Sequence, residues 1–214
     1  MSLQWDLSTV ADHLERGIRQ AEGELRLEQA VYGLDSRTEL QMHELLGEIL
    51  SRHYAVAREV PYPSTAGRRQ RHRRRCDLVL APAGRPLKRD TEAPTLFDAP
   101  ERCRPEDALW LEVKVAHQFR EGGARHGSYG SQWRQAVVAD LMKMEADPLI
   151  REAALLLVVF NESRRILEKD LELFETVLAQ KQVLAGFRQV RSVPILERIG
   201  HRVCTVALWP TIQR

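Results

Sequence analysis

Residues 154–160 form an unbroken run of seven apolar residues, which few folds can accommodate. The run is much too short to cross a membrane, since a spanning helix takes about 20 residues. Its length and its content of leucine and valine favour a strand that is buried on both faces of a sheet. Such a strand needs helices on both sides of its sheet, so we expect an α/β protein.

The rest of the chain supplies helical and strand patterns around this run. Apolar residues recur at helical spacing in four segments, 7–34, 35–53, 131–146 and 164–184. Four further segments have strand patterns, 55–60, 76–80, 109–115 and 202–209. We interpret residues 1–34 as a helical arm that covers part of the core or packs on a neighbouring protein. Residues 35–214 are expected to form one domain, with an exposed insertion at about 82–107.

The composition excludes several classes of protein. A chain that is 43% hydrophobic and 29% charged has the composition of a folded soluble domain. Its three cysteines, Cys76, Cys103 and Cys204, form no CxxC pair, which argues against a disulfide framework or a zinc site. With no apolar leader at the start and no membrane-spanning run, the chain is expected to be cytoplasmic.

Charged side chains on the third predicted strand carry the first chemical signal. Side chains alternate across a sheet, so Glu112 and Lys114 share one face while Val113 lies on the other. Two charges on an otherwise apolar strand are costly to bury without partners. A divalent metal ion would be such a partner, and Asp77 on the preceding strand could share it. The alternative is a cross-strand salt bridge on an exposed face.

These residues, and the order of the predicted helices and strands that carry them, resemble the pattern of the PD-(D/E)XK nuclease superfamily. The resemblance rests on Asp77 and on Glu112-Val113-Lys114, with Cys76 where the family has proline. It implies a restriction-endonuclease-like core, a mixed α-β-β-β-α-β sheet flanked by helices, with the N-terminal arm and a C-terminal helix plus strand added. It further implies that Asp77, Glu112 and the Val113 carbonyl hold Mg²⁺ (or Mn²⁺), and that Lys114 positions or activates the attacking water.

Many members of this superfamily also place a glutamate on the first core helix. Glu39, Glu44 and Glu48 are the candidates here. At about 100° per residue, Glu39 lies roughly 60° from the centre of the apolar stripe, whereas Glu44 lies nearly opposite. Glu39 is therefore the expected fourth catalytic and metal-binding member. The alternative is a helix-capping box with Ser36.

Two further groups are candidates for supporting roles. On the helix after the glycine-rich loop, Asp140 and Lys143 are expected to support the site or contact phosphate; a helix-end salt bridge is the alternative. Six arginines within residues 68–75 are expected to contact the nucleic-acid backbone, unless they form only a solvated basic loop. These are Arg68, Arg69, Arg71, Arg73, Arg74 and Arg75.

The resemblance and these residues together predict a Mg²⁺-dependent endonuclease that hydrolyses phosphodiester bonds, with DNA favoured as the substrate. The alternative is an inactive module that keeps the nuclease fold and binds nucleic acid or protein. A homodimer is also open, because a duplex cutter would gain from two-fold symmetry.

Overall fold

The computed structural model describes residues 5–65, 74–88 and 102–212. In chain order, the helices and strands are α1 (Leu7–Leu27), α2 (Glu39–Ser51), β1 (Tyr54–Pro61), β2 (Arg75–Pro82), β3 (Leu109–His117), α3 (Tyr129–Glu145), β4 (Glu152–Asn161), α4 (Arg164–Gln180), β5 (Gln189–Pro194) and β6 (Val203–Pro210). Short 3₁₀ helices are η1 (Leu34–Ser36), η2 (Pro63–Thr65) and η4 (Pro105–Asp107).

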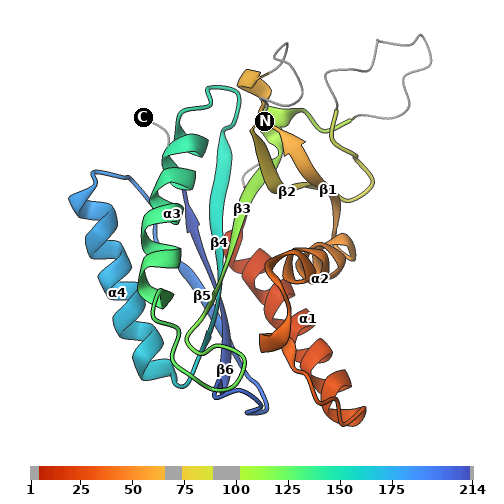
Figure 1. Cartoon of the computed structure of the whole chain (residues 1–214). Coiled ribbons are helices and arrows are strands. Elements are labelled where there is room, and N and C mark those ends of the chain that lie inside the picture. Colours follow the sequence, from red (N-terminus) through yellow and green to blue (C-terminus); the bar gives the residue numbers. More distant parts are fainter. Residues whose placement is uncertain (1–4, 66–73, 89–101, 213–214) are drawn as a thin grey trace.

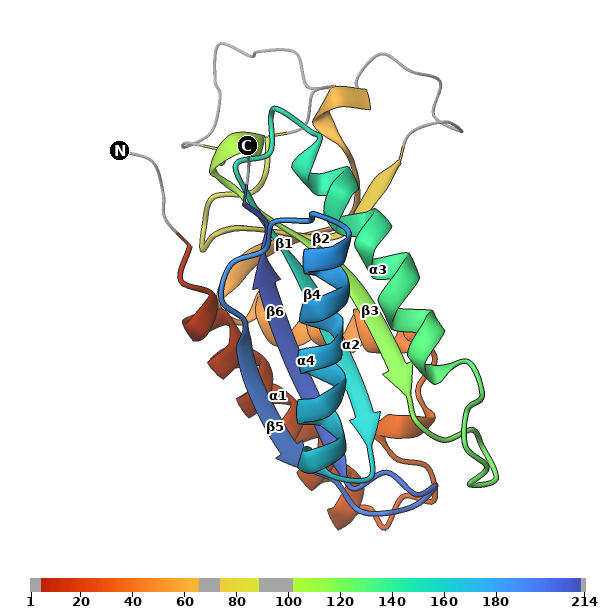
Figure 2. The same ribbon diagram turned by 90° about the vertical axis from the view of Figure 1, so that its left-hand side faces the viewer.

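One six-stranded mixed sheet, in the order β1-β2-β3-β4-β6-β5, forms the centre of the molecule. Only β3 and β4 run parallel, and every other neighbouring pair is antiparallel. Helices α1 and α2 cover one face and α3 and α4 the other (Figures 1 and 2). The predicted α/β class, with a mixed sheet flanked by helices, is confirmed. Among the described residues, no helix has the length and apolarity needed to cross a membrane.

Strand β4 explains why the sheet needs helices on both faces. It lies between β3 and β6, and every residue from Ala153 to Asn161 is buried. Its side chains alternate between two cores. Leu155 and Leu157 belong to the core under α3 and α4, whereas Leu156 belongs to the core under α1 and α2. The prediction of a strand buried on both faces is confirmed.

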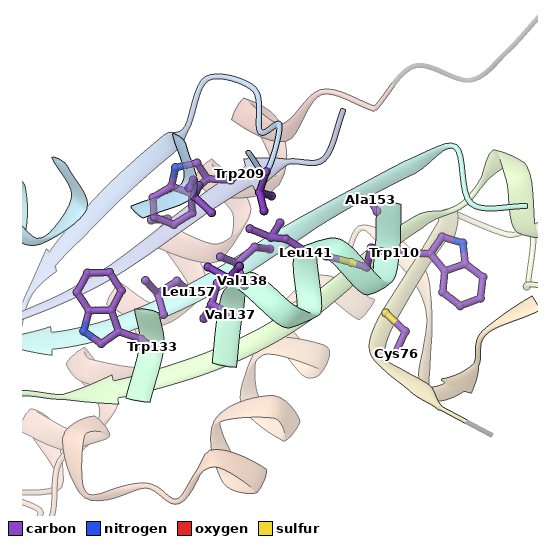
Figure 3. Packing of buried hydrophobic residues seen from close by; sticks show 14 of the residues in the cluster. Cys76, Trp110, Trp133, Val137, Val138, Leu141, Ala153, Leu157 and Trp209 are labelled. Carbon is purple, nitrogen blue, oxygen red and sulfur yellow. The ribbon is translucent and has the colours of Figure 1, made fainter. Parts of the chain in front are cut away.

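The core under α3 and α4 contains three fully buried tryptophans, Trp110, Trp133 and Trp209. Figure 3 shows α3 lying along the sheet, with Val137 and Leu141 directed between the tryptophans. This apolar packing fixes α3 against β3 and β4. It therefore fixes the position of every polar side chain that α3 presents to the same strands.

Helix α1 covers the opposite face of the sheet. It buries Val10, Leu14 and Ile18 in the core that it shares with α2. Near its end, the buried Glu22 accepts the Leu196 backbone N–H at 2.8 Å and pairs with Arg198 at 3.4 Å. These contacts join α1 to the segment between β5 and β6.

Three expectations about elements need correction. The C-terminal part is a helix plus two strands, because residues 189–194 form the edge strand β5. This strand is half-buried and carries arginine, glutamine and proline, so its sequence has no clear strand pattern. The first helical segment ends at Leu27, not at residue 34. Helix α2 begins at Glu39 and not near residue 35, and its capping box is Thr38–Gln41, which excludes the alternative of a box formed by Ser36.

Half of the predicted insertion at 82–107, residues 89–101, lies outside the described residues. On its described flanks, Leu87 and Cys103 form a β-bridge and Cys103 is buried. The two described flanks are therefore joined by backbone hydrogen bonds between residues 86–88 and Cys103.

A buried histidine joins the N-terminal segment to the end of β3. The His201 Nε2 atom accepts the Phe119 backbone N–H at 3.0 Å, so the proton lies on Nδ1 and is donated to Asp35 Oδ2 at 2.9 Å. Both the His201 and Asp35 side chains are fully buried. Removing either partner leaves the other without its hydrogen bond inside the protein.

We therefore expect His201→Ala to lower the free energy of unfolding by about 2–4 kcal/mol. His126 provides a matched control, because it is half-exposed and its ring forms a hydrogen bond with the side chain of Ser128. His126→Ala should lower the free energy of unfolding by less than about 1 kcal/mol. Urea unfolding followed by tryptophan fluorescence measures both. Equal losses for the two variants would contradict this account of His201.

Candidate active site

The charged face of β3 is the face that α3 covers. Trp110 and Ala116, before and after it, belong to the core under α3, whereas Leu111 and Val113 belong to the opposite core. Glu112 is buried, and its Oε1 atom accepts the Tyr62 hydroxyl at 2.5 Å and pairs with Lys143 Nζ at 2.5 Å. The expected alternation is thus confirmed, and the alternative of a cross-strand salt bridge on an exposed face is excluded for Glu112.

Asp77 lies where β2 leaves β3. The recorded pairs of the β2–β3 ladder end at Leu78 and Leu111. One residue further, the Asp77 Oδ2 atom accepts the Val113 backbone N–H at 2.7 Å, in place of a strand partner. β1 and β2 then turn away from the lower part of β3 (Figure 1). A carboxylate therefore lies beside Glu112 at a gap between two strands.

The backbone around Asp77 is irregular. The β1–β2 register skips Glu59 and Asp77, and Glu59 has a left-handed φ of 51°. Cys76 and Val79 both reach the core under α3, although regular alternation would put them on opposite faces. Local irregularity of this kind redirects one side chain of a strand and is frequent near functional sites. Here it directs the Asp77 side chain to the Val113 amide.

Burial sets the electrostatics of Glu112. Loss of hydration raises the pKa of Glu112 to about 7, although the hydrogen bonds from Lys143 and Tyr62 act in the opposite direction. The nearby Asp77 charge raises this pKa further. In this structure Glu112 is therefore a carboxylate that gains from any additional positive charge.

Lys114 points from the same face toward two other acids. Its Nζ atom lies 3.4 Å from Asp140 Oδ2 and 4.0 Å from Glu39 Oε1. Burial lowers the pKa of Lys114, but Asp140, Asp77 and the other neighbouring carboxylates outweigh burial and raise it. The ammonium group is consequently charged at neutral pH.

Glu39 is the first residue of α2 and its side chain is 54% exposed. The side chain lies between Lys114 and His43, whose Nε2 atom is 3.9 Å away. The structure thus brings Glu39 to Lys114 and not to Asp77 or Glu112. A catalytic or metal-binding role for Glu39 stays a prediction.

Helix α3 presents Asp140 and Lys143 to the charged face of β3, and their supporting or phosphate-contacting role stays a prediction. Lys143 contacts Glu112 directly, and its Nζ atom is 3.5 Å from Asp140 Oδ1. Sequence reasoning missed Tyr62, which follows β1, packs on Trp110 and donates to Glu112. The only available signal was an aromatic residue between two prolines at a strand end, which more often marks a turn.

Four of the six arginines in the predicted nucleic-acid contact, Arg68, Arg69, Arg71 and Arg73, lie outside the described residues. Arg74 and Arg75 are described and exposed, and Arg75 begins the strand that carries Asp77. Their proposed contact with nucleic acid stays a prediction.

The oxygen donors suit a magnesium ion. Mg²⁺ is usually held by one or two carboxylates, with water and substrate oxygens completing an octahedron. Asp77 and Glu112 supply two carboxylates on neighbouring strands, next to the Val113 backbone. In the described part of the chain, no group of three or more acidic, histidine or cysteine side chains is placed to hold a metal ion. A ligand role for the Val113 carbonyl stays a prediction.

Two adjoining cavities lie beside Lys114. The cavity next to Lys114 has a volume of about 500 Å³ and is also lined by Glu39 and Val115. Four further residues line both cavities. The second, of about 630 Å³, continues past Phe119 and Arg120. The shared residues are Arg37, Thr38, His117 and His126. Lys114 therefore lies at the edge of an open cleft, whereas Glu112 lies beneath α3.

The raised pKa of Glu112 has a consequence for stability. A folded-state pKa of about 7 against 4.5 for the free group means that the folded protein holds more protons between these values. The contribution of Glu112 to the free energy of unfolding is therefore largest below about pH 4.5 and is lost as the pH rises through 7. Glutamine keeps the shape of the protonated acid, and Lys143 retains Asp140 as a partner.

We thus expect Glu112→Gln to raise the free energy of unfolding by about 1–3 kcal/mol at pH 8 and to have little effect at pH 5. Urea unfolding at the two pH values measures the difference. The exposed Glu48, on α2, is a control whose substitution by glutamine should change neither value. A destabilised Glu112→Gln variant at pH 8 would show that the ion pair with Lys143 outweighs the burial of the carboxylate.

No family model, curated protein or solved structure matches the chain.

Proposed function

We propose that the chain is a magnesium-dependent phosphodiesterase of the PD-(D/E)XK type that cleaves nucleic acid, with DNA favoured over RNA. One observation carries this proposal. Asp77 and the pair Glu112 and Lys114 lie on neighbouring strands, at the point where these strands separate. The restriction-endonuclease-like identity of the fold is part of the same proposal, supported by the element order α2-β1-β2-β3-α3-β4.

The side chains of the site divide the work. Asp77 and Glu112 would hold the magnesium ion, and Tyr62 and the packing of α3 keep Glu112 in place. When bound, such an ion acts as a Lewis acid that stabilises charge on the phosphate and acidifies a water molecule. Lys114 remains charged between Asp140 and Glu39, and can hold the attacking water or an anionic phosphate oxygen at the edge of the cleft.

Access for a polymer supports a nucleic-acid substrate over a small one. The cleft beside Lys114 is open and carries Arg37 and Arg120 along its length. Arg74 and Arg75 are exposed at the start of the strand that bears Asp77. Arginines along the cleft and at the start of this strand suit contact with a phosphate backbone.

One observation favours the alternative, an inactive module with the same fold. Lys143 already pairs with Glu112, so the chain itself supplies a cation at the place where a metal ion would bind. The two candidate functions differ in metal binding. Calorimetric titration with MgCl₂ should give heat that Asp77→Asn removes if the chain is an enzyme, and no such heat if it is inactive.

We expect the purified chain to cleave DNA in the presence of Mg²⁺ or Mn²⁺ and not in EDTA. Because each removes a group at the reacting centre, Asp77→Asn and Lys114→Gln should each lower the rate by about 10²-fold or more. Glu48→Gln, on the exposed face of α2, should cleave at the wild-type rate. Gel assays on single-stranded DNA, duplex DNA and RNA provide the measurement. Intact substrates throughout, or equal rates for wild type and Asp77→Asn, would refute the proposal.

A further inference from the structure

The Glu112 carboxylate is already paired with a positively charged side chain, that of Lys143. A single oxygen, Oε1, receives both the Tyr62 hydroxyl and the Lys143 ammonium, each at 2.5 Å. Lys143 comes from α3, and its side chain is only 18% exposed. The ammonium also lies 4.9 Å above the Tyr62 ring. The ammonium group is therefore held beside the Glu112 carboxylate and packs against the face of the Tyr62 ring.

The same ammonium has a second partner within reach. Asp140 lies one helical turn before Lys143 on α3, and its Oδ1 atom is 3.5 Å from Nζ. The other oxygen of Asp140 faces Lys114. A small rotation of the Lys143 side chain would thus exchange one carboxylate for another and leave no buried charge unpaired.

We propose that Lys143 is an internal counter-ion that competes with the divalent metal ion for Glu112 and moves to Asp140 when the metal binds. The inference rests on the proposed function, since it takes Asp77 and Glu112 as the metal ligands. Two cations cannot share the same carboxylate oxygen without strong repulsion. Lys143 thus stabilises the charged form of Glu112 in the metal-free protein, at the expense of metal affinity.

Calorimetric titration of the full-length chain with MgCl₂ and with MnCl₂ tests this competition. Lys143→Gln keeps a hydrogen-bond donor for Glu112 but removes the charge, and should bind metal about tenfold more tightly than wild type. Lys169→Gln removes a charge of the same sign from an exposed position on α4, and provides the control. It should change the affinity less than about threefold.

A double-mutant cycle separates displacement from simple electrostatics. Asp140→Asn removes the place to which Lys143 moves, so it should weaken metal binding in the wild-type background. In the Lys143→Gln background there is no ammonium to accommodate, and the effect of Asp140→Asn should largely disappear. If charges act only at a distance, the two effects would add instead.

The outcomes decide the matter without reference to cleavage. Tighter binding by Lys143→Gln together with a non-additive cycle supports the competition, even if no nucleic acid is cut. Unchanged or weaker binding by Lys143→Gln, additive effects, or no metal binding by either protein would overturn it. If Lys143→Gln fails to fold, Asp140→Asn alone remains informative, since wild-type affinity in that variant contradicts the proposal. Metal binding with every nucleic-acid substrate left intact would instead refute the proposed cleavage, and the titrations would still decide the competition.

Discussion

A carboxylate buried on an apolar strand needs positive charge and hydrogen-bond donors, and most of the site follows from how Glu112 obtains them. Tyr62 approaches from the end of β1 and Lys143 from α3, and both reach the same oxygen. The apolar packing of α3 on the sheet, through residues such as Trp133 and Leu141, holds the ammonium in place. The core and the polar centre are therefore parts of one arrangement, since α3 supplies both.

The separation of β2 from β3 is the second condition for the site. Within a continuous ladder, the Val113 amide would pair with a strand and Asp77 would have no reason to turn toward it. Because the pairing ends at Leu78 and Leu111, the Asp77 carboxylate takes that amide and comes to lie beside Glu112. The lower part of β3 is then accessible at its edge, where Lys114 meets Glu39 and the open cleft. A reacting group needs this access to solvent, which the buried Glu112 does not have.

Sequence patterns predicted most of the sheet but only part of the site. The apolar run of β4 and the stripe of α3 are dictated by burial, which leaves a clear periodic signal. Strand β5 was missed because an edge strand needs no such signal. Glu112 and Lys114 could be assigned to one face from alternation alone. The contact of Lys143 with Glu112 and the role of Tyr62 depend on how α3 and β1 approach β3, which no local pattern records. The direction of the Asp77 side chain depends on an irregularity of β2, and strand alternation does not predict that irregularity.

The central claim is that Asp77 and Glu112 together hold a divalent ion next to Lys114. A crystal of the full-length chain soaked in MnCl₂ tests it most directly, because manganese has an anomalous signal. The claim predicts one strong peak between the two carboxylates, within about 2–2.3 Å of an oxygen from each. A map with no peak there, and with Lys143 still paired to Glu112, would contradict it.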